Sequence, residues 1–77
     1  MKEFIEYIAK HLVDHPDNVE VDEKAPEDRK LILSLKVKPD DVGKVIGKQG
    51  KTAQAMRTLL TAIAAKEGKR AILEIVD

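Results

Sequence analysis

Cysteine and tryptophan are absent from the 77 residues, and the aromatic side chains are limited to one phenylalanine and one tyrosine. Without cysteine the chain forms no disulfide and lacks the thiolate ligands of the common structural zinc sites. Its fully apolar runs are short, far below the roughly 20 residues that span a membrane. We therefore expect a cytoplasmic protein with no membrane partner, whose small core leaves a thin margin of stability.

Net charge is also lacking, because 14 basic residues balance 14 acidic ones, but the charges are unevenly distributed. Residues 1–30 carry nine acids and five bases, whereas residues 31–77 carry nine bases and five acids. The stretch from Val42 to Lys66 contains no acid, and its bases are Lys44, Lys48, Lys51, Arg57 and Lys66. Such a stretch produces a local cationic field that attracts phosphate even on a neutral chain.

Hydrophobic spacing predicts three helices and three strands. Apolar residues recur at three- and four-residue steps in the helices and alternate in the strands. The predicted order is helix 2–13, strand 19–22, strand 30–37, helix 40–46, helix 51–66 and strand 70–76. The acidic segment Glu23–Asp28, which contains Pro26, is expected to form a mobile connecting loop. Strand 70–76 is apolar on both faces and is expected to occupy a central position.

These elements predict an α+β fold of the order αββααβ. Strands 30–37 and 70–76 are joined by two helices, a crossover that layers helices against a sheet. We expect a three-stranded mixed sheet with three helices packed on one face. No repeat or linker divides the chain, so residues 1–77 are expected to form one domain, with an N-terminal helix and strand in residues 1–28 and a βααβ core in residues 29–77.

A glycine loop lies between the two helices of this crossover. Gly47 and Gly50 flank Lys48 and Gln49, and glycine permits a close approach of the backbone to a ligand. The unpaired N–H groups of the next helix point into the same region, with the charge of Lys51 nearby. Two glycines alone are equally typical of a tight turn between helices, so the surrounding elements decide the interpretation.

Those elements and the segment Val45-Ile46-Gly47-Lys48-Gln49-Gly50 resemble the core of a KH domain. With the additional N-terminal helix and strand, the whole chain resembles a type II KH domain of the small, free-standing bacterial KhpA family. In KH domains a GXXG loop clamps the backbone of about four nucleotides of single-stranded RNA, and the bases lie in an apolar groove. The resemblance therefore assigns the clamp to the loop residues Gly47, Lys48, Gln49 and Gly50.

The same resemblance implies a groove floor on the two helices and on the strand Leu31–Val37. Its helical candidates are Val45, Ile46 and Ala53, and charge is expected to come from Lys44, Lys51 and Arg57. The function implied is that of an RNA chaperone or post-transcriptional regulator linked to cell shape and division. The implied partners are a second copy of the chain, a larger KH-containing protein of the Jag type (KhpB-like), or both. The alternative is a protein-interaction or dimerisation module with little RNA affinity of its own.

Other readings of these residues fit less well. Gly50-Lys51-Thr52 matches the end of a P-loop, but the first glycine of that motif would have to stand at Val45. His11 and His15 have a spacing that suits zinc, yet no further ligand completes a known pattern. The sequence also lacks the aromatic platform of RRM and OB folds. We expect no enzyme activity, no metal, no cofactor and no small-molecule substrate.

Overall fold

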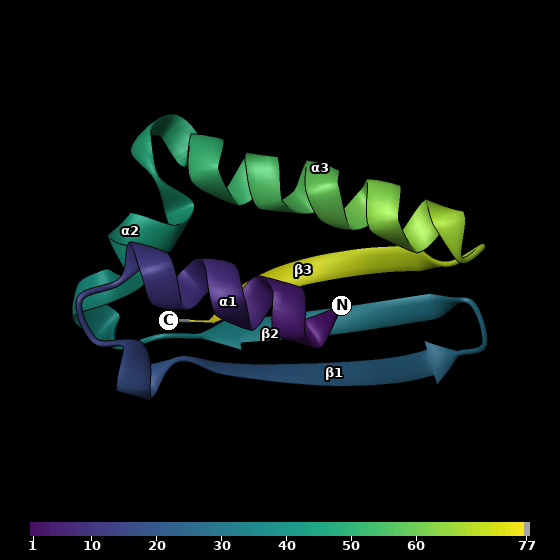
Figure 1. Ribbon diagram of the computed structural model, residues 1–77, viewed down its shortest axis with the longest axis horizontal. Coiled ribbons are helices and arrows are strands. Elements are labelled where there is room, and N and C mark those ends of the chain that lie inside the picture. The colour runs from purple at the N-terminus through teal and green to yellow at the C-terminus, as the bar shows by residue number, and fades with distance from the viewer. Residues whose placement is uncertain (77) are drawn as a thin grey trace.

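A three-stranded sheet organises the protein, which is described by a computed structural model over residues 1–76 (Figure 1). The strands are β1 (Glu20–Glu27), β2 (Lys30–Lys36) and β3 (Arg70–Val76), in the order β1-β2-β3. Strands β1 and β2 pair antiparallel, whereas β2 and β3 pair parallel. The predicted mixed sheet is thus confirmed. Asp77, the last residue of the predicted domain, lies outside the described residues.

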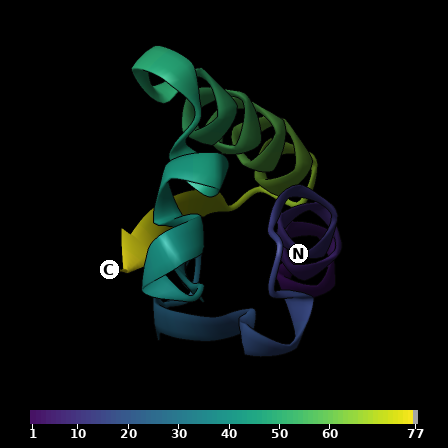
Figure 2. The same ribbon diagram turned by 90° about the vertical axis from the view of Figure 1, so that its left-hand side faces the viewer.

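Three helices complete the α+β fold. Helix α1 (Lys2–Leu12) precedes the sheet, and the crossover from β2 to β3 contains α2 (Val42–Ile46) and α3 (Lys51–Lys66). Helices α1 and α3 lie over the same face of the sheet, with α3 above β3, and α2 lies at the end of the sheet (Figures 1 and 2). Short 3₁₀ turns, η1 (Pro16–Asn18), η2 (Pro39–Asp41) and η3 (Lys48–Gly50), connect the elements.

Strand β1 is longer than predicted. It continues through the segment Glu23–Asp28 as far as Glu27, so the expectation of a mobile loop there is wrong. The register shifts between Lys24 and Glu27, and Pro26 lies inside this irregularity. Because β1 is an edge strand, a proline without an N–H group is tolerated there. The acidic side chains of the segment are exposed along this edge.

Strand β3 also lies at an edge, which contradicts its predicted central position. The central strand is β2, because the β1 hairpin pairs on one side of it and the crossover returns β3 to the other. The apolar residues on the second face of β3 are therefore not explained by a central position in the sheet. Ile72 pairs in register with Ile32 on the side of the sheet opposite the helices, and both side chains are half-buried.

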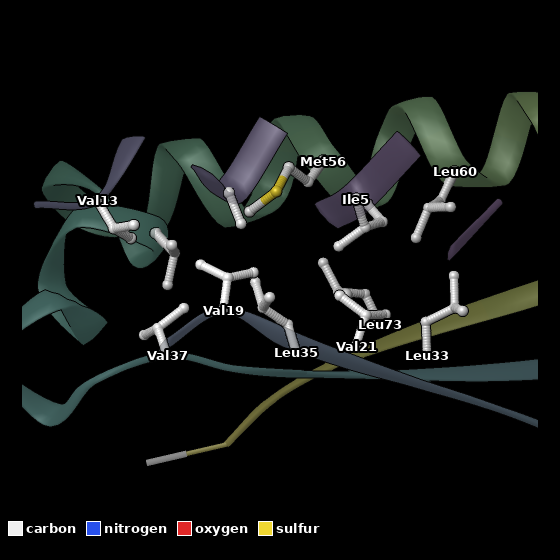
Figure 3. Packing of buried hydrophobic residues seen from close by; sticks show 12 residues of the cluster. Ile5, Val13, Val19, Val21, Leu33, Leu35, Val37, Met56, Leu60 and Leu73 are labelled. Carbon is white, nitrogen blue, oxygen red and sulfur yellow. The ribbon is translucent and has the colours of Figure 1, made fainter. Parts of the chain in front are cut away.

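The core lies between the helices and the sheet (Figure 3). Alternate residues of β2 point into it, as the period of two predicts. Its buried members are Ile5, Ala9, Val13, Val19, Val21, Leu33, Leu35, Val37, Val45, Met56, Leu60 and Leu73. Leu60 is fully buried, whereas its neighbour Leu59 on α3 is 48% exposed.

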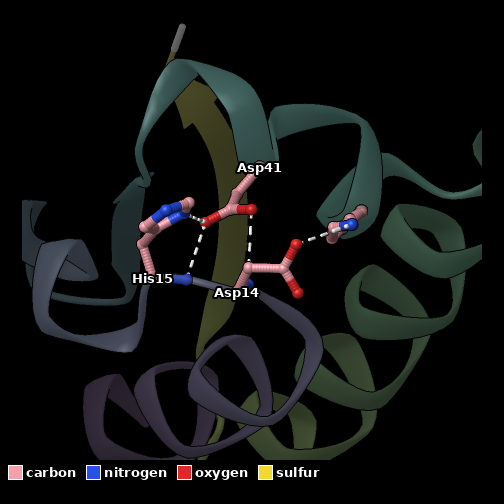
Figure 4. Close-up of polar contacts among 4 residues, drawn as sticks. Asp14, His15 and Asp41 are labelled. Atoms are coloured by element: carbon pink, nitrogen blue, oxygen red, sulfur yellow. Dashed lines mark hydrogen bonds and ion pairs between the residues drawn. The ribbon is translucent and has the colours of Figure 1, made fainter.

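One buried carboxylate connects the chain after α1 to the start of α2 (Figure 4). Asp41 is 1% exposed, and it accepts hydrogen bonds from the backbone N–H groups of Asp14 (3.3 Å) and His15 (3.0 Å). The His15 ring nitrogen Nδ1 lies 2.9 Å from Asp41 Oδ2. Burial alone raises the pKa of Asp41, but the hydrogen bonds from the His15 side chain and the two backbone groups outweigh it and lower the pKa.

We expect Leu60→Ala to reduce the free energy of unfolding by about 2–5 kcal/mol, because it leaves a cavity in the core. Leu59→Ala is a matched control, since it removes the same atoms from an exposed position, and we expect a loss below about 1 kcal/mol. Urea unfolding of both variants measures the difference. Similar losses of unfolding free energy in the two variants would contradict the assignment of one leucine to the core and the other to the surface.

A second prediction concerns pH. Because the pKa of Asp41 is lowered on folding, its contribution to stability is present above the ordinary carboxyl pKa and is lost as pH falls through the lowered value. We expect Asp41→Asn to be less stable than wild type at neutral pH, with the gap closing in acid. Urea unfolding across a pH series tests this, with the exposed neighbour substitution Asp40→Asn as control. A gap that stays constant into acid would contradict the prediction.

Candidate functional site

The loop Gly47–Gly50 has an unusual backbone. Gly47 and Gly50 have φ values of 77° and 73°, and Gln49 has a φ of 57°. A non-glycine residue in the left-handed region costs on the order of 1 kcal/mol, and such residues cluster at binding sites. The loop is closed by a 3.1 Å hydrogen bond from the Gly50 N–H to the Gly47 carbonyl oxygen. The glycines and this internal hydrogen bond therefore define the conformation of the loop.

Gly47 is required here for two reasons. Its positive φ disfavours any side chain, and a Cβ atom at this position would overlap the side chain of Thr52 in the first turn of α3. The space beside Gly50 is open, so only its left-handed backbone favours glycine. The loop thus packs closely against the start of α3 on one side and is open on the other.

The open side of the loop is electropositive. Lys48, Gln49 and Lys51 are exposed, and no side chain caps the first turn of α3. The backbone N–H of Lys51 bonds to the carbonyl oxygen of Lys48, and the positive end of the helix dipole adds to the two ammonium charges. The structure therefore brings together the groups that the sequence placed at the loop, in an arrangement suited to an anion.

An acid that the sequence analysis did not connect with the site lies beside it. Asp14 Oδ2 is 3.1 Å from the ammonium nitrogen of Lys44, so one charge of the acid-free stretch is paired with an acid from elsewhere in the chain. No local pattern shows this pair, because 30 residues separate the partners and only the fold brings them together.

The predicted apolar groove residues lie in different environments. Val45 and Ala53 are buried, so their side chains are not available to a ligand. Ile46 is 37% exposed next to the loop, where it is available to a ligand. The strand predicted for the groove, Leu31–Val37, is central, and its apolar residues Leu31, Leu33, Leu35 and Val37 lie under the helices. These side chains therefore belong to the core, and the groove along this strand stays a prediction.

A hollow of about 380 Å³ lies instead between α3 and β3. Its lining combines apolar and cationic residues from the two elements and the turn between them, namely Arg57, Thr61, Ala65, Lys69, Arg70, Ala71, Ile72 and Leu73. Arg57 follows Lys51 by six residues, or about 9 Å along the helix axis, so it belongs to this hollow rather than to the loop. Lys69 and Arg70 were not predicted as site residues, although a basic pair directly after Gly68 was the available signal.

The two histidines whose spacing suits zinc contact other side chains of the protein. His15 contacts Asp41, and the ring of His11 lies against that of Tyr7 in a tilted arrangement with a centroid separation of 4.4 Å. Within residues 1–76 no group of three or more potential ligand side chains is placed to hold a metal ion. Over the same residues, none of the helices has both the length and the apolar character needed to cross a membrane.

Comparison with known proteins gives a consistent match. The model of the KhpA/KhpB KH domain matches residues 2–75. RNA-binding protein KhpA of Clostridium acetobutylicum is 55% identical over 76 residues, which cover 99% of this chain and 100% of that protein. RNA-binding protein KhpA of Caldanaerobacter subterraneus subsp. tengcongensis is 57% identical over the same shares of the two chains.

A more distant relative matches over the full length as well. RNA-binding protein KhpA of Aquifex aeolicus is 49% identical over 77 residues, which cover 100% of this chain and 96% of that protein. No solved structure gives a significant match. The αββααβ order of the structure is that of a type II KH domain, and the family model spans all of its elements but the last residue of β3. The chain belongs to the KhpA/KhpB family of KH domains.

Proposed function

We propose that the protein binds single-stranded RNA by clamping its sugar-phosphate backbone at the loop Gly47–Gly50. The observation that carries the proposal is the loop itself, in which three of four residues have positive φ and the exposed side is electropositive. Relatives that match over nearly their whole length are named RNA-binding proteins. The proposal is one of binding, without catalysis.

The loop suits a nucleic-acid backbone because it presents N–H groups and cations at a surface with little steric obstruction. Lys48 and Lys51 supply point charges, while the first turn of α3 supplies the positive end of its dipole. Such contacts position a strand without reading its sequence. Ile46, exposed next to the loop, offers an apolar surface to a neighbouring base.

We further propose that the strand continues from the loop along α3 into the hollow beside β3. Arg57, Lys69 and Arg70 place three cations around an apolar lining that contains no acid. Bases have apolar faces and phosphates carry the charge, so this mixture suits both parts of a nucleotide. The groove strand in this proposal is β3, which replaces the strand Leu31–Val37.

The biological role we propose is RNA chaperoning or post-transcriptional control, linked to cell shape and division through a larger Jag-type, KhpB-like partner. The family model is named for both KhpA and KhpB, which supports a relationship between the two kinds of protein. In this proposal residues 1–77 act as one KH unit in the cytoplasm.

The loop is tested by replacing Lys48 and Gln49 together with aspartate. Both side chains are exposed, so the fold is retained while two carboxylates face the phosphates. We expect affinity for labelled single-stranded RNA to fall at least tenfold, since each lost or repelled contact weakens phosphate binding. Fluorescence anisotropy measures the loss. The matched control is Asn18→Asp with Lys24→Asp, which makes the same charge change at exposed positions outside the loop; equal losses in both variants would refute the clamp.

Salt dependence separates the clamp from the alternative of a pure interaction module. With three or four phosphates neutralised, the logarithm of affinity should fall against the logarithm of salt concentration with a slope of roughly −2 to −3. The double-aspartate loop variant should give a shallower slope. A flat response of the wild type would favour the interaction module.

A specific surface supports self-association as a second function. Leu59 is exposed on α3, and Ala55, Ala62 and Ile63 lie within one turn of it. Residues three and four apart share a helix face, so these side chains form an apolar stripe. Its small residues allow the close approach of a second copy.

We expect sedimentation equilibrium of the wild type to show a mass that rises with concentration, and Leu59→Glu to shift this rise to higher concentration. A glutamate carboxylate buried in an apolar contact loses its water and gains no partner, which weakens the association. Tyr7→Glu is the control, because Tyr7 is an exposed apolar residue of α1. A wild type that stays monomeric at high concentration would exclude self-association.

A further inference from the structure

An ion pair joins Asp14 to Lys44 at 3.1 Å, and one dashed line in Figure 4 runs from the Asp14 carboxylate. Lys44 is three residues before Gly47 on α2, and the Gly47 N–H bonds to the carbonyl oxygen of Gly43 at 2.9 Å. Lys44 therefore belongs to the turn of helix that leads into the loop. Its ammonium group is held by an acid that belongs to the segment after α1.

Asp14 is placed there by a rigid support. Its backbone N–H donates to the buried carboxylate of Asp41, and the next residue, His15, donates to the same carboxylate from its backbone. These bonds fix the backbone of the segment against the start of α2. The Asp14 side chain is then presented to Lys44 from a fixed position rather than from a mobile loop.

Lys44 differs from the other cations of the proposed site because it is paired with an acid. Within residues 1–76, Lys44 forms an ion pair, whereas no ion pair is found for Lys48, Lys51 or Arg57. The side chains of Asp14 and Lys44 are 69% and 44% exposed. A pair so open to solvent is weak, so another anion can exchange with the carboxylate.

We propose that Asp14 competes with RNA phosphate for Lys44 and thereby lowers the affinity of the clamp for RNA. This inference rests on the proposed function. A phosphate that approaches Lys44 must either displace the Asp14 carboxylate or leave the ammonium group paired, and in the paired state the strand has one cation fewer to contact. The carboxylate also repels phosphate directly at short range.

The test is Asp14→Asn, which removes the charge and keeps the backbone N–H that bonds to Asp41. We expect affinity for a labelled single-stranded RNA of randomised sequence to rise about two- to fivefold at low salt, the range of an exposed ion pair. The salt slope should become steeper by about 0.7, the value for one further phosphate contact on a single strand.

Two comparisons isolate the pair. Asp17→Asn removes the same charge from the exposed turn η1, where Asp17 forms no ion pair within the described residues, and we expect little change in affinity. In a Lys44→Ala background, Asp14→Asn should bring almost no gain. Urea unfolding of each variant confirms that the fold is intact.

The outcomes distinguish this inference from the proposed function. If Asp14→Asn gains no more than Asp17→Asn, or gains as much without Lys44, the competition does not exist although the clamp stands. If the double-aspartate loop variant binds RNA as well as the wild type, the clamp itself fails and the competition fails with it. A gain that depends on Lys44 supports the inference.

Discussion

The parallel pairing of β2 with β3 is the constraint on which the rest of the structure depends. Their register runs without interruption from Lys30 opposite Arg70 to Lys36 opposite Val76. Parallel neighbours cannot be joined by a hairpin, so the chain must cross over the sheet between them. The crossover holds α2, the glycine loop and α3, and it places the loop away from the strands, where both of its exposed residues meet solvent.

Acidic and basic side chains lie on different parts of this fold, although their numbers balance. The acidic side chains of β1 lie along the edge of the sheet opposite β3, whereas the cations of the loop and of the hollow lie on the crossover and on β3 itself. A chain with no net charge thus keeps a cationic surface where a polyanion would bind. Screening limits the range of each charge to about 8–10 Å, so the acids nearest to each cation, such as Asp14 beside Lys44, matter more than the balance over the whole chain.

Much of the fold was predictable because it rests on local patterns. The alternation in β2, the apolar spacing of α1 and α3 and the glycines around Lys48 and Gln49 each gave the correct element. The predictions were wrong where the structure of a segment depends on the strand that pairs with it. The acidic segment from Glu23 to Glu27 becomes strand because β2 offers it a partner, and the apolar side chain of Ile72 is matched by Ile32 rather than by a second layer of structure.

The candidate site shows the same division. The loop and its lysines were identified from neighbouring residues, whereas the Asp14–Lys44 pair and the hollow beside β3 join segments that are distant in sequence. Asp41 could be assigned to a helix start, where acids are favoured, but its hydrogen bonds to Asp14 and His15 needed the folded chain. Burial of Val45 and Ala53 was likewise a property of packing.

The buried Asp41 carboxylate has a consequence for motion. Because one side chain holds the segment after α1 and the start of α2, neither can open without breaking hydrogen bonds of the other. Local opening in proteins proceeds in cooperative units, and these two segments form one such unit although 26 residues separate His15 from Asp41. Amide exchange at the helix that precedes the loop is therefore governed by the same opening event that frees the end of α1.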